Sequence, residues 1–404
     1  MRGLSKIEAA AAQAAAGEPM LEQVRAWAAV NSGSRNLAGL AEMAGILANA
    51  FSALPTDPAL CEPAWAEDVD ASGAARSIQH GRNLHLRVRP DAPVQLLFTG
   101  HMDTVFAAEH DFQDVFWREP GKVLGGPGVA DMKGGIAVLL AALKAVEASP
   151  LAPQLGYEIV INSDEEVGST GSAALIAAAA RGKKAAFTYE PAAFPDGTLA
   201  GARPGSGNFA LVVAGRSAHA GRNPEEGRNA LLAAADLALR LDRAKAPGLS
   251  VNPARIDGGS PTNVVPDHAV LRINMRPRTP IDEERGRLLL DKIVAAVAAE
   301  RDVHINIHGG FGRQPKPLTP GAEALFRFVA RCGADLGQHI AWRDTGGVCD
   351  GNNIAACGVP VVDTMGVRGG AIHSEEEYLI VESLAERASL SALAILRLAS
   401  GDAL

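Results

Sequence analysis

The chain has 404 residues, of which 47% are hydrophobic and 43 are glycines, and its formal net charge is −8. This length allows two domains with separate cores, and the composition excludes a disordered chain and a disulfide scaffold. The negative net charge gives no electrostatic reason to expect a nucleic-acid partner.

Cysteine spacing and the N-terminal segment favour a cytoplasmic protein. The four cysteines form no Cys-x-x-Cys pair, so neither a thiolate zinc site nor thioredoxin chemistry is expected. The N-terminus carries charge where a secretory signal is apolar, and it predicts an amphipathic helix or a tail. No window approaches the length of a membrane span without charge, so no membrane partner is expected.

The first predicted strand of interest ends in a histidine. Residues 19–53 predict two helices, residues 76–89 are strand-like, and the apolar run 94–100 reads as a buried strand. Because strand side chains alternate, His101 and Asp103 are expected to point the same way at its end. A carboxylate there can orient a metal-binding imidazole, although the pair alone also fits an ordinary strand-end histidine.

A glycine-rich loop follows, with the sequence GGPGVADMKGG over residues 125–135, and it leads into a helix over 136–148. The loop lacks the Gly-Lys-Ser/Thr ending of a P-loop and does not match Gly-x-Gly-x-x-Gly. An aspartate in such a loop suits a bound cation, and it equally suits a helix cap. Asp131 is therefore a second candidate ligand.

Two further strands end in glutamates. The strand over 157–162 is followed by Glu165 and Glu166, and a short strand over 185–189 runs into Glu190. If Glu166 binds a metal, Glu165 is close enough to handle a proton on a water molecule. Several strands thus deliver acidic or imidazole groups at their C-terminal ends, where open α/β sheets bind ligands.

The middle of the chain predicts an inserted smaller α+β domain over residues 202–314. The flanking parts, residues 1–201 and 315–404, form one discontinuous catalytic domain. The insertion has its own pattern of strands and helices: strands over 209–213, 269–275 and 303–308, and helices over 227–244 and 281–300. Its expected loops carry polar groups that would be ordinary solvated residues if taken singly: His219, Asn263, Arg276 and Arg313.

The final segment supplies a second imidazole, His373, after a Gly-Gly pair and before a helix over 380–399. The full set of candidate ligands is His101, Asp131, Glu166, Glu190 and His373. Two imidazoles and three carboxylates fit a borderline divalent metal, with zinc as first choice and cobalt or manganese as alternatives. Five ligands exceed one open tetrahedral site but suit two metals that share a bridging carboxylate.

Five motifs in order resemble those of the dinuclear zinc peptidases and deacylases, a family that includes glutamate carboxypeptidase, acetylornithine deacetylase and succinyl-diaminopimelate desuccinylase. They are GHMDT at 100–104, GVADMKGG at 128–135, DEEVG at 164–168, YEP at 189–191 and IHS at 372–374. The resemblance covers about residues 20–400. It implies a mixed-sheet α/β catalytic domain and an inserted lid domain that carries a homodimer interface.

The resemblance also implies a role for each candidate ligand. Asp131 would bridge two metal ions. Glu166 and His373 would complete one site, and His101 and Glu190 the other.

Other roles are implied for residues next to these ligands. Glu165 would be the general base, taking a proton from the attacking water and later giving it to the leaving amine, and Asp103 would orient His101. The family has a cis peptide after the bridging aspartate, here Asp131–Met132. Within SAHAG at 217–221, His219 matches a histidine that stabilises the oxyanion in a neighbouring subunit's site.

The resemblance narrows the substrate to a small peptide or N-acyl amino acid. Asn263, Arg276 and Arg313 are candidates for binding its free carboxylate, since arginine offers a bidentate fork. Glutamate rather than aspartate at Glu190 favours a carboxypeptidase or deacylase over a tripeptidase, and the nearest likeness is to glutamate carboxypeptidases. A deacetylase or desuccinylase is the alternative. A catalytically silent metal-binding protein is a distant one, because neither Glu165 nor any ligand is missing.

Overall fold

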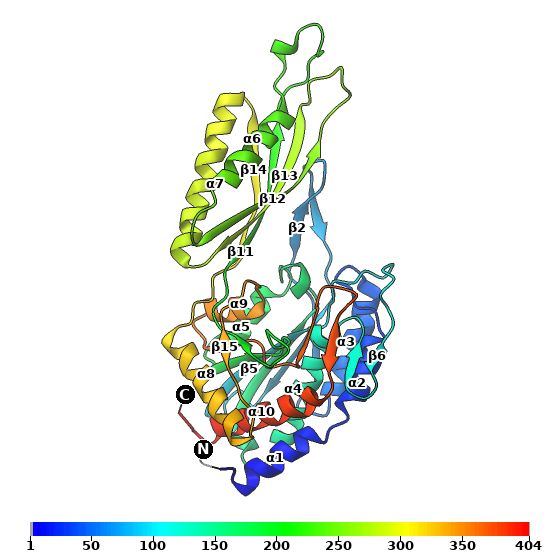
Figure 1. Cartoon of the computed structure of the whole chain (residues 1–404), viewed down its shortest axis with the longest axis vertical. Helices are drawn as coiled ribbons and strands as arrows, with labels where there is room; N and C mark the ends of the chain where they lie inside the picture. The colour runs from blue at the N-terminus through cyan, green and yellow to red at the C-terminus, as the bar shows by residue number, and fades with distance from the viewer. Residues whose placement is uncertain (1–2, 404) are drawn as a thin grey trace. The chain divides into compact units, whose positions relative to one another are not determined.

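The computed structural model of the chain describes residues 3–403 and contains two compact units. Unit 1 comprises the chain up to Ala64, Gln79–Ala202 and the segment from Leu318 onward, and unit 2 comprises Trp65–Ile78 and Arg203–Pro317. Figure 1 shows the elements of both. Among the described residues, no helix is long and apolar enough to cross a membrane.

The main sheet of unit 1 mixes parallel and antiparallel strands in the order β1-β4-β8-β5-β9-β16. Strands β8, β5, β9 and β16 run parallel, whereas β4 is antiparallel to both β1 and β8. The prediction of a mixed-sheet α/β fold is confirmed. The bounds are β1 (Ala59–Cys61), β4 (Asn83–Val88), β8 (Leu155–Asn162), β5 (Val94–His101), β9 (Ala185–Thr188) and β16 (Val361–Val362).

Both faces of this sheet are buried, because alternate side chains of its strands enter different cores. On β5, Leu96 and Phe98 lie in the larger core with α4 and α10, whereas Leu97 lies in a smaller core with α5 and α9. Helices α1, α4 and α10 pack against one another (Figure 1). The helices of unit 1 are α1 (Lys6–Ala16), α2 (Met20–Ala28), α3 (Leu37–Phe51), α4 (Gly135–Glu147), α5 (Ala173–Ala180), α8 (Pro320–Asp335), α9 (Asp350–Ala356) and α10 (Glu382–Ala399).

A small antiparallel sheet in unit 1 has the order β17-β18-β7-β6. Its strands are β17 (Gly369–Gly370), β18 (Tyr378–Ile380), β7 (Val123–Gly125) and β6 (Phe116–Glu119), and β10 (Leu199–Ala200) pairs separately with β15 (Trp342–Arg343). Strand β7 leads into the glycine-rich loop, and β17 leads towards His373. This sheet, which the sequence analysis did not anticipate, therefore anchors two segments that carry candidate ligands.

A buried ion-pair triad joins three helices of unit 1. The guanidinium of Arg397 on α10 donates to Glu8 on α1 and to Asp335 on α8, at 2.8 Å in each case. Arg397→Leu is expected to lower the free energy of unfolding by about 3–5 kcal/mol, because two buried carboxylates lose their cation. Chemical denaturation would measure the loss. The exposed Arg327→Leu on α8 should change stability by less than about 1 kcal/mol, and equal effects of the two variants would contradict the prediction.

Unit 2 is built on an antiparallel sheet in the order β12-β13-β11-β14. Helices α6 and α7 pack on this sheet, and their apolar side chains share one core with it. The elements are β11 (Ser206–Ala214), α6 (Ala230–Arg243), β12 (Leu249–Gly258), β13 (His268–Pro277), α7 (Pro280–Arg301) and β14 (His304–Arg313). Strand β12 was not predicted, because its exposed charged residues hide the period-two alternation.

A hairpin from the N-terminal part of the chain also belongs to unit 2. Strands β2 (Ala66–Val69) and β3 (Ala75–Ile78) pair with each other, and Val69 packs against Ala210 and Val270 of the sheet. The sequence analysis placed these residues in the continuous segment 1–201. Short strands with few apolar residues carry no sequence signal for the surface on which they pack.

Candidate metal centre

Three strand ends meet at one edge of the main sheet. His101 is the last residue of β5 and lies in register with Asn162, the last residue of β8. Glu165 and Glu166 follow β8 in a short 3₁₀ turn, and Glu190 follows β9 on the other side of β5. The parallel direction of these strands brings the groups together, as the sequence predicts.

Asp131 reaches the same edge through the glycine-rich loop. A Cβ atom on Gly135 would lie 1.9 Å from the carbonyl oxygen of Tyr189, so the absence of a side chain lets the start of α4 approach β9 closely. Asp131 is 5% exposed, and its side chain does not cap α4. The Asp131–Met132 peptide bond is cis, as the resemblance implies.

His373 arrives from the loop after β17. Its φ of 62° lies in the left-handed region, as does the φ of 52° at Ala371. Non-glycine residues adopt this region at a cost, and the surrounding contacts must hold them there. His373 is the most exposed candidate ligand, with 52% of its side chain accessible.

The nitrogen and oxygen atoms of the candidate ligands converge. His101 Nε2 lies 3.1 Å from Asp131 Oδ1 and 3.6 Å from Glu190 Oε2. His373 Nε2 lies 3.2 Å from Asp131 Oδ2 and 3.1 Å from Glu166 Oε2. Each oxygen of Asp131 thus faces a different imidazole, each of which has a second carboxylate beside it. This donor set fits divalent cations with a shared carboxylate.

The electrostatic field of the carboxylates favours positive charge at both imidazoles. Burial lowers the pKa of His101, but Glu190, Asp103 and Asp131 outweigh that effect and raise the pKa well above its usual value. Hydrogen bonds to Asp131 and Glu166 raise the pKa of His373 to about 11. A site that stabilises protons so strongly is suited to hold metal cations in their place.

Asp103 contributes mainly through its position behind the ligands. His101 Nδ1 lies 2.9 Å from the backbone carbonyl of Asp103 and 3.4 Å from its carboxylate Oδ1. The carbonyl can only accept, so this nitrogen carries the proton and leaves Nε2 for a metal. The carboxylate accepts the backbone N–H groups of Glu165 and Glu166 at 3.1 and 3.2 Å, and the hydroxyl of Ser34 at 2.7 Å. Asp103 therefore orients both the histidine and the turn with the two glutamates.

Glu165 lies in the cluster beside His101 and Glu190. It is 7% exposed, and one of its oxygens lies within 4.8 Å of ligand atoms of His101 and Glu190. A buried carboxylate beside the metal ligands is placed to exchange a proton with a reacting water molecule.

The sequence analysis missed Glu377. Its carboxylate accepts backbone N–H groups from Gly128, Ala130 and Asp131 at 2.9–3.1 Å and so holds the loop that presents the aspartate. Glu377 belongs to a run of three glutamates. Its neighbour Glu376 has a side chain that is 74% exposed, whereas Glu377 is 1% exposed. Only the three-dimensional structure distinguishes them.

Glu377→Gln is expected to weaken metal binding by about 10–100-fold, because an amide cannot accept all three N–H groups and the loop loses its anchor. Competition with a chelator would measure the affinity. Glu376→Gln removes the same charge one residue away and should leave the affinity unchanged. Equal affinities for the two variants would contradict the positioning role.

The structure separates the candidate residues of unit 2 into two pairs. His219 and Asn263 lie in facing loops, where the Ala220 N–H donates to the Asn263 carbonyl at 2.9 Å. The His219 loop follows the last residue of β11, and the Asn263 loop joins β12 to β13 at the same end of the sheet, whereas Arg276 and Arg313 lie near the first residues of β11. The two pairs are separated by the nine-residue strand, roughly 27 Å at 3.4 Å per residue.

Comparisons with known proteins agree with this geometry. The family model described as "Peptidase family M20/M25/M40" matches residues 97–397. The chain belongs to this peptidase family. It is 30% identical over 336 residues to carboxypeptidase G2 of Pseudomonas sp. (strain RS-16), which covers 80% of this chain and 78% of the relative. It is 26% identical over 355 residues to a succinyl-diaminopimelate desuccinylase of Psychrobacter arcticus, with coverage of 82% and 84%.

Solved structures of the M20 family have the same fold. An M20 family metallo-carboxypeptidase from Sulfolobus solfataricus superposes with a TM-score of 0.68 at 14% identity, covering 94% of this chain and 99% of that one. The predicted resemblance is thereby confirmed. The chain is a hydrolase of the M20 metallopeptidase and deacylase type.

Proposed function

We propose that this M20 hydrolase cleaves an amide bond and releases a C-terminal glutamate-like amino acid from a peptide or an N-acyl substrate. The observation that carries this proposal is that His101, Asp131 and His373 converge with two further carboxylates. Glu165 lies beside this group of candidate ligands. The likeness to carboxypeptidase G2 supports the carboxypeptidase specificity. The likeness to a succinyl-diaminopimelate desuccinylase supports N-acyl amino acid deacylation as the second candidate.

The site is proposed to hold two divalent ions, with zinc preferred and cobalt or manganese as alternatives. Asp131 would be shared, His101 and Glu190 would hold one ion, and His373 and Glu166 the other. Bound divalent ions polarise a carbonyl and lower the pKa of a water molecule.

Glu165 is proposed to act as the general base and acid. Its carboxylate would take a proton from the attacking water and later donate it to the leaving nitrogen, so that the amine departs neutral. Asp103 supports this step because it holds the Glu165 N–H at 3.1 Å and limits the movement of the turn. The presence of Glu165 with all five ligands argues against a catalytically silent metal-binding protein.

A hydrolysis screen with the metal-loaded enzyme tests the specificity. Acyl-glutamates and folyl-type glutamates would be compared with N-acetylornithine, succinyl-diaminopimelate and dipeptides. Highest kcat/KM for a C-terminal glutamate supports the carboxypeptidase assignment. Highest kcat/KM for an acylated ornithine or diaminopimelate would replace it with the deacylase assignment.

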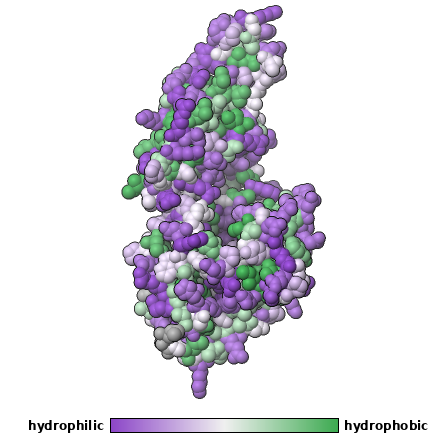
Figure 2. All heavy atoms as spheres, in the orientation of Figure 1, coloured by the Kyte–Doolittle hydropathy of each residue, from purple (hydrophilic) through white to green (hydrophobic). Residues whose placement is uncertain are grey.

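A homodimer through unit 2 is part of the proposal. Helices α6 and α7 expose apolar side chains, among them Leu232 (53% exposed), Leu239 (56%) and Leu288 (60%). In Figure 2, apolar areas lie among polar ones over the part of the chain that carries these helices. In that dimer, His219 would stabilise the oxyanion in the site of the second copy, and Asn263, Arg276 and Arg313 would bind the free carboxylate of the substrate.

His219→Ala is expected to lower kcat by about 10²–10³-fold with no change in metal content, because a donor to the oxyanion is lost. His304→Ala, another exposed histidine of unit 2, is the matched control. Co-expressed Glu165→Gln and His219→Ala chains should recover activity if the histidine acts across subunits, since a mixed dimer contains one complete site. Full activity of His219→Ala alone would remove this residue from the mechanism.

A further inference from the structure

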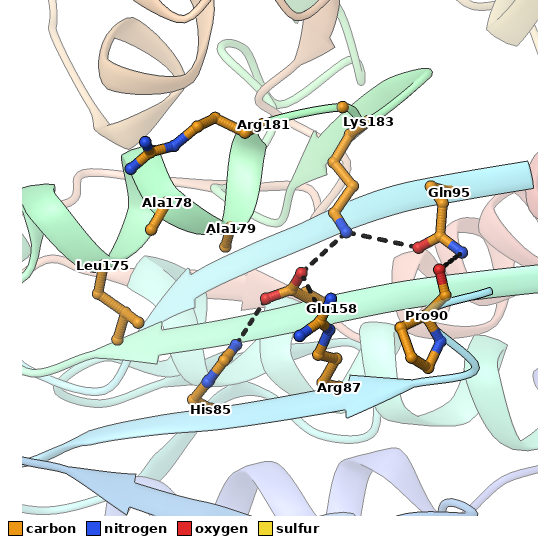
Figure 3. Close-up of a pocket in the computed structure, with 11 residues that line it drawn as sticks. His85, Arg87, Pro90, Gln95, Glu158, Leu175, Ala178, Ala179, Arg181 and Lys183 are labelled. Carbon is orange, nitrogen blue, oxygen red and sulfur yellow. Dashed lines mark hydrogen bonds and ion pairs between the residues drawn. The ribbon is translucent and has the colours of Figure 1, made fainter.

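Unit 1 contains a pocket on the α5 face of the main sheet, away from the metal centre. It has a volume of about 360 Å³ and lies between the C-terminal end of α5 and strands β4, β5 and β8 (Figure 3). Gln95, the second residue of β5, lines this pocket, whereas His101 at the other end of the same strand is a candidate metal ligand. Six residues of extended strand separate them by roughly 20 Å, so the two sites do not overlap.

The pocket is positively charged although the chain as a whole is negative. Three cationic side chains line it, Arg87, Arg181 and Lys183, against one carboxylate, that of Glu158. The chain carries a formal net charge of −8, so this local excess of positive charge is not a general property of its surface. Such an excess in a concave site raises the local concentration of small anions.

Glu158 is shared among three basic neighbours, so its single charge offsets only part of the positive charge of the pocket. Its carboxylate lies 2.8 Å from His85 Nε2 and 2.9 Å from Lys183 Nζ, and the Lys183 side chain is 6% exposed. Arg87 Nε forms a longer ion pair with Glu158 at 3.8 Å, and its side chain is 63% exposed (Figure 3). Among residues 3–403, the Arg181 side chain has no hydrogen-bond or ion-pair partner, and Figure 3 shows it directed back along α5.

We propose that this pocket binds a small organic anion with carboxylate or phosphate groups. Arg87 and Arg181 would contact the charged groups, because a guanidinium offers paired N–H donors that match either anion. Leu175, Ala178 and Ala179 of α5 supply the apolar wall for the carbon part of the ligand. A volume of a few hundred Å³ is in the range of sites for small molecules, and the polar lining suits a charged one.

Calorimetric titration of the metal-loaded enzyme tests the proposal, with succinate and inorganic phosphate as separate probes. The variant R87Q/R181Q removes both guanidinium groups, and R327Q/R331Q on α8 removes the same charge from another exposed surface of unit 1. Each lost arginine should weaken binding by about tenfold, because one charge-assisted hydrogen-bonding group disappears. We expect about a hundredfold loss in R87Q/R181Q and none in the control.

The outcomes separate this pocket from the metal centre, whose ligands both double variants retain. Equal metal content and circular dichroism of the two variants would show that both are folded. Tighter binding of succinate assigns the site to carboxylates, and tighter binding of phosphate assigns it to phosphate compounds. Equal affinities in R87Q/R181Q and R327Q/R331Q, or no binding of either probe to the unmodified enzyme, would overturn the proposal.

Discussion

Glu165→Gln is expected to lower kcat by about 10²–10⁴-fold while the enzyme keeps its full metal content. Glutamine has nearly the shape of glutamate, so it fits the buried position, which is 7% exposed, but its amide cannot take up a proton. Initial rates on the substrate chosen by the screen, together with metal analysis of the same samples, would measure both effects.

The neighbouring variant Glu166→Gln provides the contrast. Glu166 Oε2 lies 3.1 Å from His373 Nε2, so its loss is expected to lower metal content as well as activity. The two adjacent glutamates are thereby distinguished by metal content rather than by rate alone. Persistent hydrolysis by Glu165→Gln would disprove its assignment as the base, and metal loss in that variant would make it a ligand instead.

Removal of metal is expected to abolish hydrolysis, and addition of zinc or cobalt to restore it. Removal of metal should also lower the thermal midpoint of unfolding. A ligand that binds only the folded state stabilises it by about 2.7 kcal/mol when the free ligand concentration is a hundred times Kd. The loss of stability has a further cause in the site. The carboxylates of Asp131, Glu166 and Glu190 cluster around His101 and His373, and without metal they lose their counter-charge. Activity assays and thermal scans before and after dialysis against EDTA would measure both changes.

Calcium is the control for metal identity. It prefers six to eight oxygen ligands and binds poorly to imidazole, so it should not restore the rate. Full activity of chelator-treated enzyme with no detectable metal would contradict the mechanism. Recovery with calcium alone would contradict the assignment of His101 and His373 as ligands.

Sequence patterns predicted the parts of the site that depend on strand direction. Apolar runs predicted β5, β8 and β9, and parallel strands end at a common edge, so the acidic and imidazole groups after them had to meet. The order of the motifs predicted the family, and the family model confirmed it. For Asp131 the residues alone left a helix cap open, and in the structure its side chain does not cap α4 but faces both imidazoles.

Contacts between segments distant in the chain could not be predicted from local patterns. Glu377 supports the loop around Asp131 from 246 residues away, and its neighbours in the glutamate run have the same chemistry. Asp103 was expected to act on His101 through its carboxylate, which lies 3.4 Å from the imidazole; its backbone carbonyl also contacts the ring, and the same carboxylate holds the glutamate turn. Backbone donors carry no sequence identity, so no motif indicates which carboxylate will accept them.

By itself the sequence determined the family, the mixed α/β fold and the residue types around the metal centre, because strand periodicity and motif order are local properties. Tertiary structure decided which groups touch. It placed one oxygen of Asp131 towards each histidine, buried Glu377 beside exposed Glu376, and left Arg181 without a carboxylate partner among the described residues. These outcomes depend on packing between elements far apart in the chain, and such packing determines the burial and charge environment of each side chain.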